Sequence, residues 1–134
     1  MSGLVLKLAP NERVLINGAV IENGDRRSKI AIRTPNANVL RLKDAIHPDR
    51  ANTPVGRACY IAQLILSGDA QPDEGKRQLL LAIAQLSQVF DGAAAQAVLQ
   101  EARASAEDGA IYPALRRLRE LLPQEDQLIH ARRQ

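Results

Sequence analysis

The chain has 134 residues, of which 46% are hydrophobic and only 2% aromatic, and its formal net charge is +3. This length fits one domain, or a small module with a second layer, and allows a core of Leu, Ile, Val and Ala. No apolar run is long enough to span a membrane and the start MSGLVLKLAPNER lacks the apolar region of a signal peptide, so we expect a cytoplasmic protein without a membrane partner.

The first fifty residues show the period and the turn residues of short antiparallel strands. Alternation and β-branched runs predict strands over residues 3–8, 13–17, 19–22, 28–34 and 38–43. Asn17-Gly18 and Asn23-Gly24 are typical of tight hairpins, because Asn and Gly tolerate the positive φ of a type I′ turn. The short connection TPNA favours strands 28–34 and 38–43 as neighbours.

Helical patterns follow the two prolines of residues 47–54. Thr53 can cap a helix whose first position is Pro54. Apolar residues at helical spacing predict helices over residues 54–67, 73–90, 93–106 and 110–122, and we expect the polar tail beyond them to fray. The predicted fold class is α+β, with a small N-terminal antiparallel β module (1–50) followed by a region (51–134) of three or four helices.

Signals of catalysis or of bound cofactors are missing from the sequence. His47 lies beside a proline and His130 in the polar tail, and no zinc-ligand spacing occurs. The glycines of the first part fall in turns rather than in a phosphate-binding loop. Cys59, the single cysteine, lies in an apolar run and is expected to be a buried reduced thiol. These observations predict a protein that is not an enzyme and carries no metal or cofactor.

Positive charge is concentrated in the first part of the chain. Residues 1–53 hold nine Lys or Arg against five Asp or Glu, whereas residues 54–134 hold nine against ten. If the last two strands are neighbours, strand alternation gathers four basic residues on one surface, with two more at its end. The four are Lys29, Arg33, Arg41 and Lys43, and the two at the end are Arg26 and Arg27. This surface either protects a sheet edge and keeps it soluble, or holds the phosphates of a nucleic acid.

The absence of aromatics narrows the kind of nucleic acid. RNA-recognition sheets expose aromatic rings on which bases stack, and residues 1–53 contain none. A DNA-binding helix-turn-helix in the helical part remains open, although that part is net negative. Single-stranded RNA, held through its backbone and by Arg or Lys at base edges, fits better.

Two stretches carry a family resemblance. Residues 8–32 (LAPNERVLINGAVIENGDRRSKIAI) and 51–69 (ANTPVGRACYIAQLILSGD) resemble the FlbT regulators of flagellin synthesis over about residues 4–70. The resemblance implies a cytoplasmic protein that binds the 5′ untranslated region of flagellin mRNA and alters its translation or decay. Members of the family include repressors and activators, and we expect a repressor here.

A more distant resemblance links the first part to the carbon storage regulators. Residues 4–16 (LVLKLAPNERVLI) and 39–46 (VLRLKDAI) are similar to the start and end of that small β-sheet family, and Lys43 stands where its RNA-contacting basic residue would lie. The paired arginines of that family are replaced by Leu8 and Ala9. What the resemblance implies is an RNA-binding sheet edge and an intertwined dimer.

Two further expectations concern protein partners. A fifty-residue sheet without aromatics has a small core and open edges, so we expect a homodimer. The alternative function is a protein-protein adaptor that binds flagellin, its export chaperone or another flagellar regulator. Exposed apolar residues on an amphipathic helix would favour the adaptor.

Overall fold

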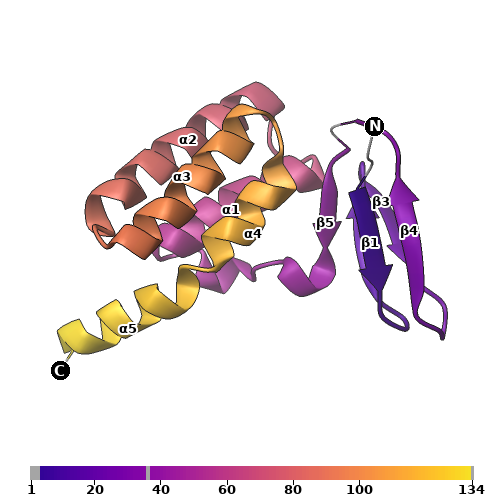
Figure 1. Cartoon of the computed structure of the whole chain (residues 1–134), viewed down its shortest axis with the longest axis horizontal. Coiled ribbons are helices and arrows are strands. Elements are labelled where there is room, and N and C mark those ends of the chain that lie inside the picture. The colour runs from indigo at the N-terminus through magenta and orange to yellow at the C-terminus, as the bar shows by residue number, and fades with distance from the viewer. Residues whose placement is uncertain (1–3, 36, 134) are drawn as a thin grey trace.

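The computed structural model describes residues 4–35 and 37–133, with an antiparallel β module beside a bundle of helices (Figure 1). The predicted α+β class is confirmed. Gly3, expected to open the first strand, and Asn36, expected in a connection, lie outside the described residues. The strands are β1 (Leu4–Leu8), β2 (Arg13–Ile16), β3 (Ala19–Glu22), β4 (Ser28–Ile32) and β5 (Val39–Arg41).

The strands pair in an order that the sequence did not predict. β1 pairs with β4 in one sheet, and β2 lies between β3 and β5 in another, so the prediction that strands 28–34 and 38–43 are neighbours is wrong. Asn17 accounts for the difference, because its N–H donates to the carbonyl of Asn38 at 2.8 Å and its Oδ1 accepts the Asn38 N–H at 2.9 Å. These bonds hold the start of β5 against the end of β2.

Only one of the two Asn-Gly pairs makes a hairpin turn. Asn17 and Gly18 have φ values of 49° and 85° and connect β2 to β3, as the sequence predicted. Asn23 and Gly24 lack positive φ, and the hairpin expected there is wrong because β3 and β4 do not pair. The Asn23 side chain instead donates to the carbonyls of Ala9 and Arg26, both at 2.8 Å.

Five helices follow the strands in the described part of the chain. Thr53 caps the first, since its Oγ1 accepts the Gly56 N–H at 3.1 Å, and Pro54 occupies the first helical position. The predicted helix over residues 54–67 is confirmed at both ends. The helices are α1 (Pro54–Ser67), α2 (Pro72–Val89), α3 (Ala93–Glu107), α4 (Ile111–Arg119) and α5 (Leu122–Arg133).

The C-terminal segment differs from its prediction. α4 ends at Arg119, and the tail that was expected to fray continues as α5, which points away from the β module (Figure 1). Glu125 fixes this helix, because its carboxylate is buried and accepts the Val55 N–H at 2.7 Å. An acidic side chain of α5 thereby caps the N-terminus of α1.

Buried residues of the β module and of the helices form one continuous hydrophobic core. Leu6, Leu8 and Val14 belong to it, together with the expected stripe of α2, whose Leu79 and Ile83 are fully buried. Cys59 is buried too, as predicted, and burial raises the pKa of its thiol to about 12. None of the helices in the described part of the chain combines the length and apolar character needed to cross a bilayer.

A short 3-10 helix, Leu42–Asp44, joins β5 to the helical part. Strand β5 ends at Arg41, so the prediction that places Lys43 in a strand is wrong. Asp44 anchors the short helix: its Oδ2 accepts the Tyr112 hydroxyl at 2.8 Å, and its carbonyl accepts an N–H of Arg119 at 2.9 Å. Lys43 is therefore presented from a segment that α4 holds in place.

Candidate nucleic-acid interface

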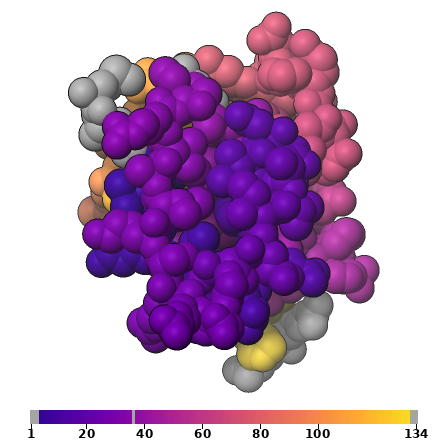
Figure 2. All heavy atoms as spheres, turned by 90° about the vertical axis from the view of Figure 1, so that its right-hand side faces the viewer, coloured from indigo at the N-terminus to yellow at the C-terminus, as the bar shows by residue number. Residues whose placement is uncertain are grey.

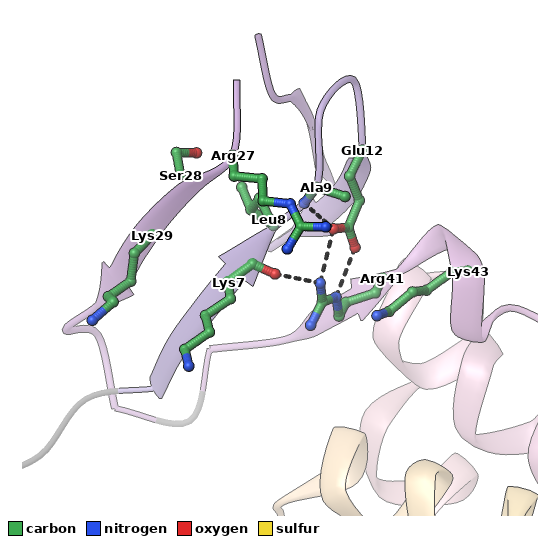
Figure 3. A pocket seen from close by; sticks show the side chains of 9 residues that line it. All are labelled: Lys7, Leu8, Ala9, Glu12, Arg27, Ser28, Lys29, Arg41 and Lys43. Atoms are coloured by element: carbon green, nitrogen blue, oxygen red, sulfur yellow. Dashed lines mark hydrogen bonds and ion pairs between the residues drawn. The ribbon is translucent and has the colours of Figure 1, made fainter. Parts of the chain in front are cut away.

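An open pocket of about 470 Å³ lies where the end of β1, the start of β4 and the end of β5 approach one another (Figure 3). The five cations and one carboxylate that line it give a formal net charge of +4. It is formed entirely by the β module and the 3-10 helix that follows. Its lining residues are Lys7, Leu8, Ala9, Glu12, Arg27, Ser28, Lys29, Arg41 and Lys43.

A tight turn places the single carboxylate. Pro10 and Asn11 occupy the centre of the β1–β2 connection, where Asn11 adopts a φ of 61° and the Glu12 N–H donates to the carbonyl of Ala9 at 3.1 Å. The Glu12 side chain then turns back, and its Oε1 accepts the Ala9 N–H at 2.9 Å. The turn thereby directs the carboxylate into the pocket.

Glu12 and Arg41 form a two-bond ion pair on the pocket wall (Figure 3). The Arg41 Nε donates to Oε2 at 2.7 Å and its Nη2 donates to Oε1 at 2.8 Å and to the Lys7 carbonyl at 2.6 Å. The hydrogen bonds from Arg41 lower the pKa of the Glu12 carboxyl to about 2. Arg41 is therefore neutralised by Glu12 and braces β1 against β5.

Lys7 and Lys29 face each other across the β1–β4 ladder. They are direct register partners, so their side chains share one face, and Figure 3 shows both extending toward the same side of the pocket. Like charges placed opposite each other on paired strands destabilise a sheet. Salt or a bound anion would remove this repulsion.

Arg27 and Lys43 enter the pocket from the two sides of the ion pair (Figure 3). Within residues 4–35 and 37–133, no ion pair neutralises either of them, or Lys7 or Lys29. Ser28 adds a hydroxyl to the lining, although its Oγ donates to Asn23 Oδ1 at 2.7 Å. The arrangement suits a ligand with several negative charges.

The pocket gathers some of the predicted basic residues and leaves others out. Arg27, Lys29, Arg41 and Lys43 line it. Arg26 and Arg33 are exposed but are not lining residues, so the predicted six do not form one surface on two neighbouring strands.

Two charged pocket residues were not among the predicted ones: Lys7 and Glu12. Lys7 alternates with the buried Leu6 and Leu8, so the sequence could predict that it points outward. The sequence could not predict that Lys29 is its partner across the sheet. Glu12 carries no local signal, since its role depends on Arg41, which is 29 residues away in the sequence.

The β module fills most of the face seen from the right of Figure 1, and Figure 2 shows the helices only around its margin. Ligands can therefore approach the β module without displacing a helix. The described part of the chain holds no group of three His, Cys, Asp or Glu side chains placed to bind a metal ion. His47 is exposed and its Nδ1 accepts the Asp49 N–H at 3.2 Å, outside the pocket.

Comparison with known families shows the family to which the chain belongs. The family model described as flagellar protein FlbT matches residues 4–129, which is nearly the whole chain. The chain belongs to the FlbT family. The resemblance inferred from residues 8–32 and 51–69 is thereby confirmed, and it extends through the helices.

Relatives of the chain are named as repressors rather than as enzymes. A probable flagellum biosynthesis repressor protein FlbT of Allorhizobium ampelinum is 34% identical over 134 residues, covering 96% of this chain and 85% of the relative. A protein of the same name from a Caulobacter species is 37% identical over 70 residues, covering 52% of this chain and 53% of the relative. The flagellum biosynthesis repressor protein FlbT of Caulobacter vibrioides is 47% identical over 51 residues, covering 38% of this chain and 36% of the relative.

The matches differ in how much of each relative they include. Against the two Caulobacter proteins the chain spans about half of the relative's length or less, whereas against the Allorhizobium protein it spans most of it. No solved structure is significantly similar to this chain.

Proposed function

We propose that this FlbT family member is a cytoplasmic, non-catalytic repressor of flagellin production that binds the 5′ untranslated region of flagellin mRNA. Binding would alter translation or stability of the message. The names of the relatives support the regulatory part of the proposal. The basic pocket of the β module supports the RNA part.

The observation that carries the proposal is the pair of opposed lysines in a pocket of net positive charge. Lys7 and Lys29 are placed where they repel each other, and two more cations share their cavity without an ion-pair partner among the described residues. Such a pairing destabilises the sheet unless an anion neutralises the two charges. RNA phosphates would neutralise the repulsion, and their binding by the lysines would release counterions from the RNA.

The pocket suits single-stranded RNA held through its backbone. Lys7, Lys29 and Lys43 can act as point charges for phosphates, while the planar guanidinium of Arg27 can bind a phosphate or a base edge with two parallel bonds. No aromatic ring lines the pocket, so stacking of bases is not part of its chemistry. Arg26 and Arg33, exposed outside the pocket, would attract the RNA at longer range.

A salt series tests the proposal. Fluorescence anisotropy with a labelled flagellin leader RNA should give a log K that falls against log salt with a slope of about −3, as expected for four phosphate contacts on a single strand. A coding-region RNA of equal length serves as the specificity control. Absence of binding at low salt, or an affinity that does not change with salt, would contradict RNA binding by this pocket.

A second candidate function rests on a different part of the molecule. An apolar groove of about 130 Å³ lies between the end of α2 and α5, lined by Pro54, Val89, Phe90, Glu125, Leu128 and Ile129. Val89 and Leu128 are 57% and 49% exposed, which is the feature expected of an adaptor. Pull-down of flagellin, its export chaperone or another flagellar regulator should fail with Leu128→Asp if this groove binds them.

A further inference from the structure

We infer that two copies of this chain associate through the open edge of β3, with a twofold axis at Val20. Of the five strands, β3 is the one whose residues are all exposed, and it ends the sheet that continues through β2 and β5. Val20 is 65% exposed and Ile21 is 39% exposed, although neighbouring residues of a strand point to opposite faces. Apolar side chains thus lie uncovered on both faces of an open edge.

The edge strands β4 and β3 differ in the charge that they carry. β4 carries Lys29 and is flanked by Arg27 and Arg33, the kind of charge that keeps strand edges from pairing with other chains. β3 reads Ala-Val-Ile-Glu and has neither a lysine nor a proline. Its only acid, Glu22, is engaged by Arg13 of the neighbouring strand at 2.7 Å. The edge of β3 therefore lacks the charged residues that protect the edge of β4.

The ladder shows which backbone groups are available. Ile16 and Ala19 flank a two-residue turn and form a hydrogen-bonded pair, so Ala19 and Ile21 bond to β2 while Val20 and Glu22 direct their N–H and C=O groups outward. The N–H of Asn23 donates to the Glu12 carbonyl at 2.8 Å, which confirms the alternation. An added antiparallel strand must therefore bond to Val20 and Glu22.

The β3 strand of a second copy can form these bonds, and the pairing places apolar side chains opposite apolar side chains. With the twofold axis at Val20, this residue pairs with Val20 of the second copy, and Ala19 lies opposite Ile21 of the second copy. The next register, centred on Ile21, would set Val20 against Glu22 and is less favourable. The pairing joins two three-stranded sheets into one of six strands, within the usual size of open sheets.

Charge also fits the arrangement. Glu22 lies opposite Gly18 of the second copy, so the two Glu22 side chains are separated by about four residues, or roughly 14 Å along the strand. This distance exceeds the screening length of about 8 Å at physiological ionic strength. β3 lines no part of the basic pocket, and the dimer would therefore present two pockets to one RNA.

Cysteine cross-linking of the full chain tests both the dimer and its register. The native Cys59 is buried and should give no background. Val20→Cys should form a disulfide-linked dimer, because hydrogen-bonded partners have Cα atoms about 5.5 Å apart, within the range that a disulfide spans. Ile21→Cys and Glu22→Cys are the matched controls and should form no disulfide-linked dimer on non-reducing gels. Cross-linking at residue 21 or 22 but not at residue 20, or at none of the three, would overturn the inference.

Light scattering gives an independent reading. The unmodified chain at tens of micromolar should have twice its mass of 14.6 kDa. Val20→Lys should weaken dimerisation at least about tenfold by opposing two charges at the axis, with an unchanged circular dichroism spectrum. Leu81→Lys, at an α2 residue that is 53% exposed, should leave the dimer intact. A monomeric unmodified chain, or a dimer that survives Val20→Lys, would exclude this interface.

Discussion

Glu12 and Arg41 form an ion pair whose side chains are only 9% and 13% exposed. From the sequence, Arg41 is one of six equivalent basic residues, and nothing local distinguishes it from Arg26 or Arg33. Burial beside Glu12 gives Arg41 a structural role, because its guanidinium connects β1, the first turn and β5 and is not free to bind a ligand. The structural role of Arg41 could not be predicted from its own sequence context, because its partner Glu12 lies 29 residues away in the chain.

We predict that Glu12→Gln lowers the free energy of unfolding by about 1.5–3 kcal/mol at pH 7, because it weakens hydrogen bonds to a charged group and leaves Arg41 unneutralised. Urea denaturation followed by circular dichroism measures this change. Glu22→Gln is the matched control, since Glu22 pairs with Arg13 in an ion pair that is more than half exposed on both sides. A loss below about 1 kcal/mol is expected there, and equal losses for both variants would contradict a special role for Glu12.

The same pair predicts a pH dependence. The carboxyl pKa is lowered from 4.5 to about 2 by the bonds from Arg41, so the unfolded chain binds more protons between these values. Its stabilisation is complete above about pH 4.5 and is lost as the pH falls through about 2. Thermal unfolding of the Glu12→Gln variant should show a shallower loss of stability over this range than the unmodified chain does.

Lys7 and Lys29 give a prediction of opposite sign. Replacing either by Gln should raise the free energy of unfolding by a few tenths of a kcal/mol at low salt, because it removes the repulsion across the ladder. A double-mutant cycle should give a coupling of about 0.2–0.5 kcal/mol that disappears at about 1 M salt, where screening is complete within a few ångströms. Zero coupling at low salt would show that the two charges do not interact.

The elements show how far sequence patterns reach. Helices could be predicted because their signals are local: Thr53 and Pro54 start α1, and the apolar stripe of α2 repeats at helical spacing. The strands themselves could also be predicted. The pairing of the strands could not be predicted. β5 is held to β2 by bonds between Asn17 and Asn38, and the local propensities of these two residues do not indicate that they contact each other.

α5 escaped prediction for a similar reason. Its sequence is polar, and the interaction that fixes it is the buried Glu125 carboxylate on the Val55 N–H of α1, 70 residues away in the chain. Asp126 adds an exposed ion pair with Arg50 at 3.6 Å. A helix that is held by contacts with residues distant in the chain has no strong local signal.

We predict that Glu125→Ala destabilises the protein by about 1–3 kcal/mol, because the buried Val55 N–H loses its acceptor. Glu125→Gln should cost less, since the amide oxygen can still accept. Gln124→Ala, at the exposed neighbouring residue, should change stability by less than about 0.5 kcal/mol. Hydrogen exchange should show that the loss is greatest at the N-terminus of α1 and in α5, and a uniform loss over the chain would argue against this capping role.

In the whole molecule, the β module supplies the charged pocket and the helices supply the support that holds Lys43 in it. Tyr112 and Arg119 of α4 fix Asp44, the residue that follows Lys43. The sequence could indicate that the first part attracts anions, because the excess of Lys and Arg is confined there. It could not define the pocket, because Lys7 and Lys43 reach it only through the pairing of β1 with β4 and of β5 with β2.

We propose that the pocket cations bind the phosphates of the flagellin leader RNA. The most direct test is the salt dependence of leader binding for the double variant Lys7→Gln with Lys29→Gln, which should be at least as stable as the unmodified chain. The matched control, Arg57→Gln with Arg103→Gln, removes the same charge from exposed residues of α1 and α3. We predict that the lysine variant binds at least about tenfold more weakly, with a slope reduced from about −3 to about −1.5, while the control binds nearly as the unmodified chain does. Unchanged affinity and slope for the lysine variant, or an equal loss in the control, would contradict the claim.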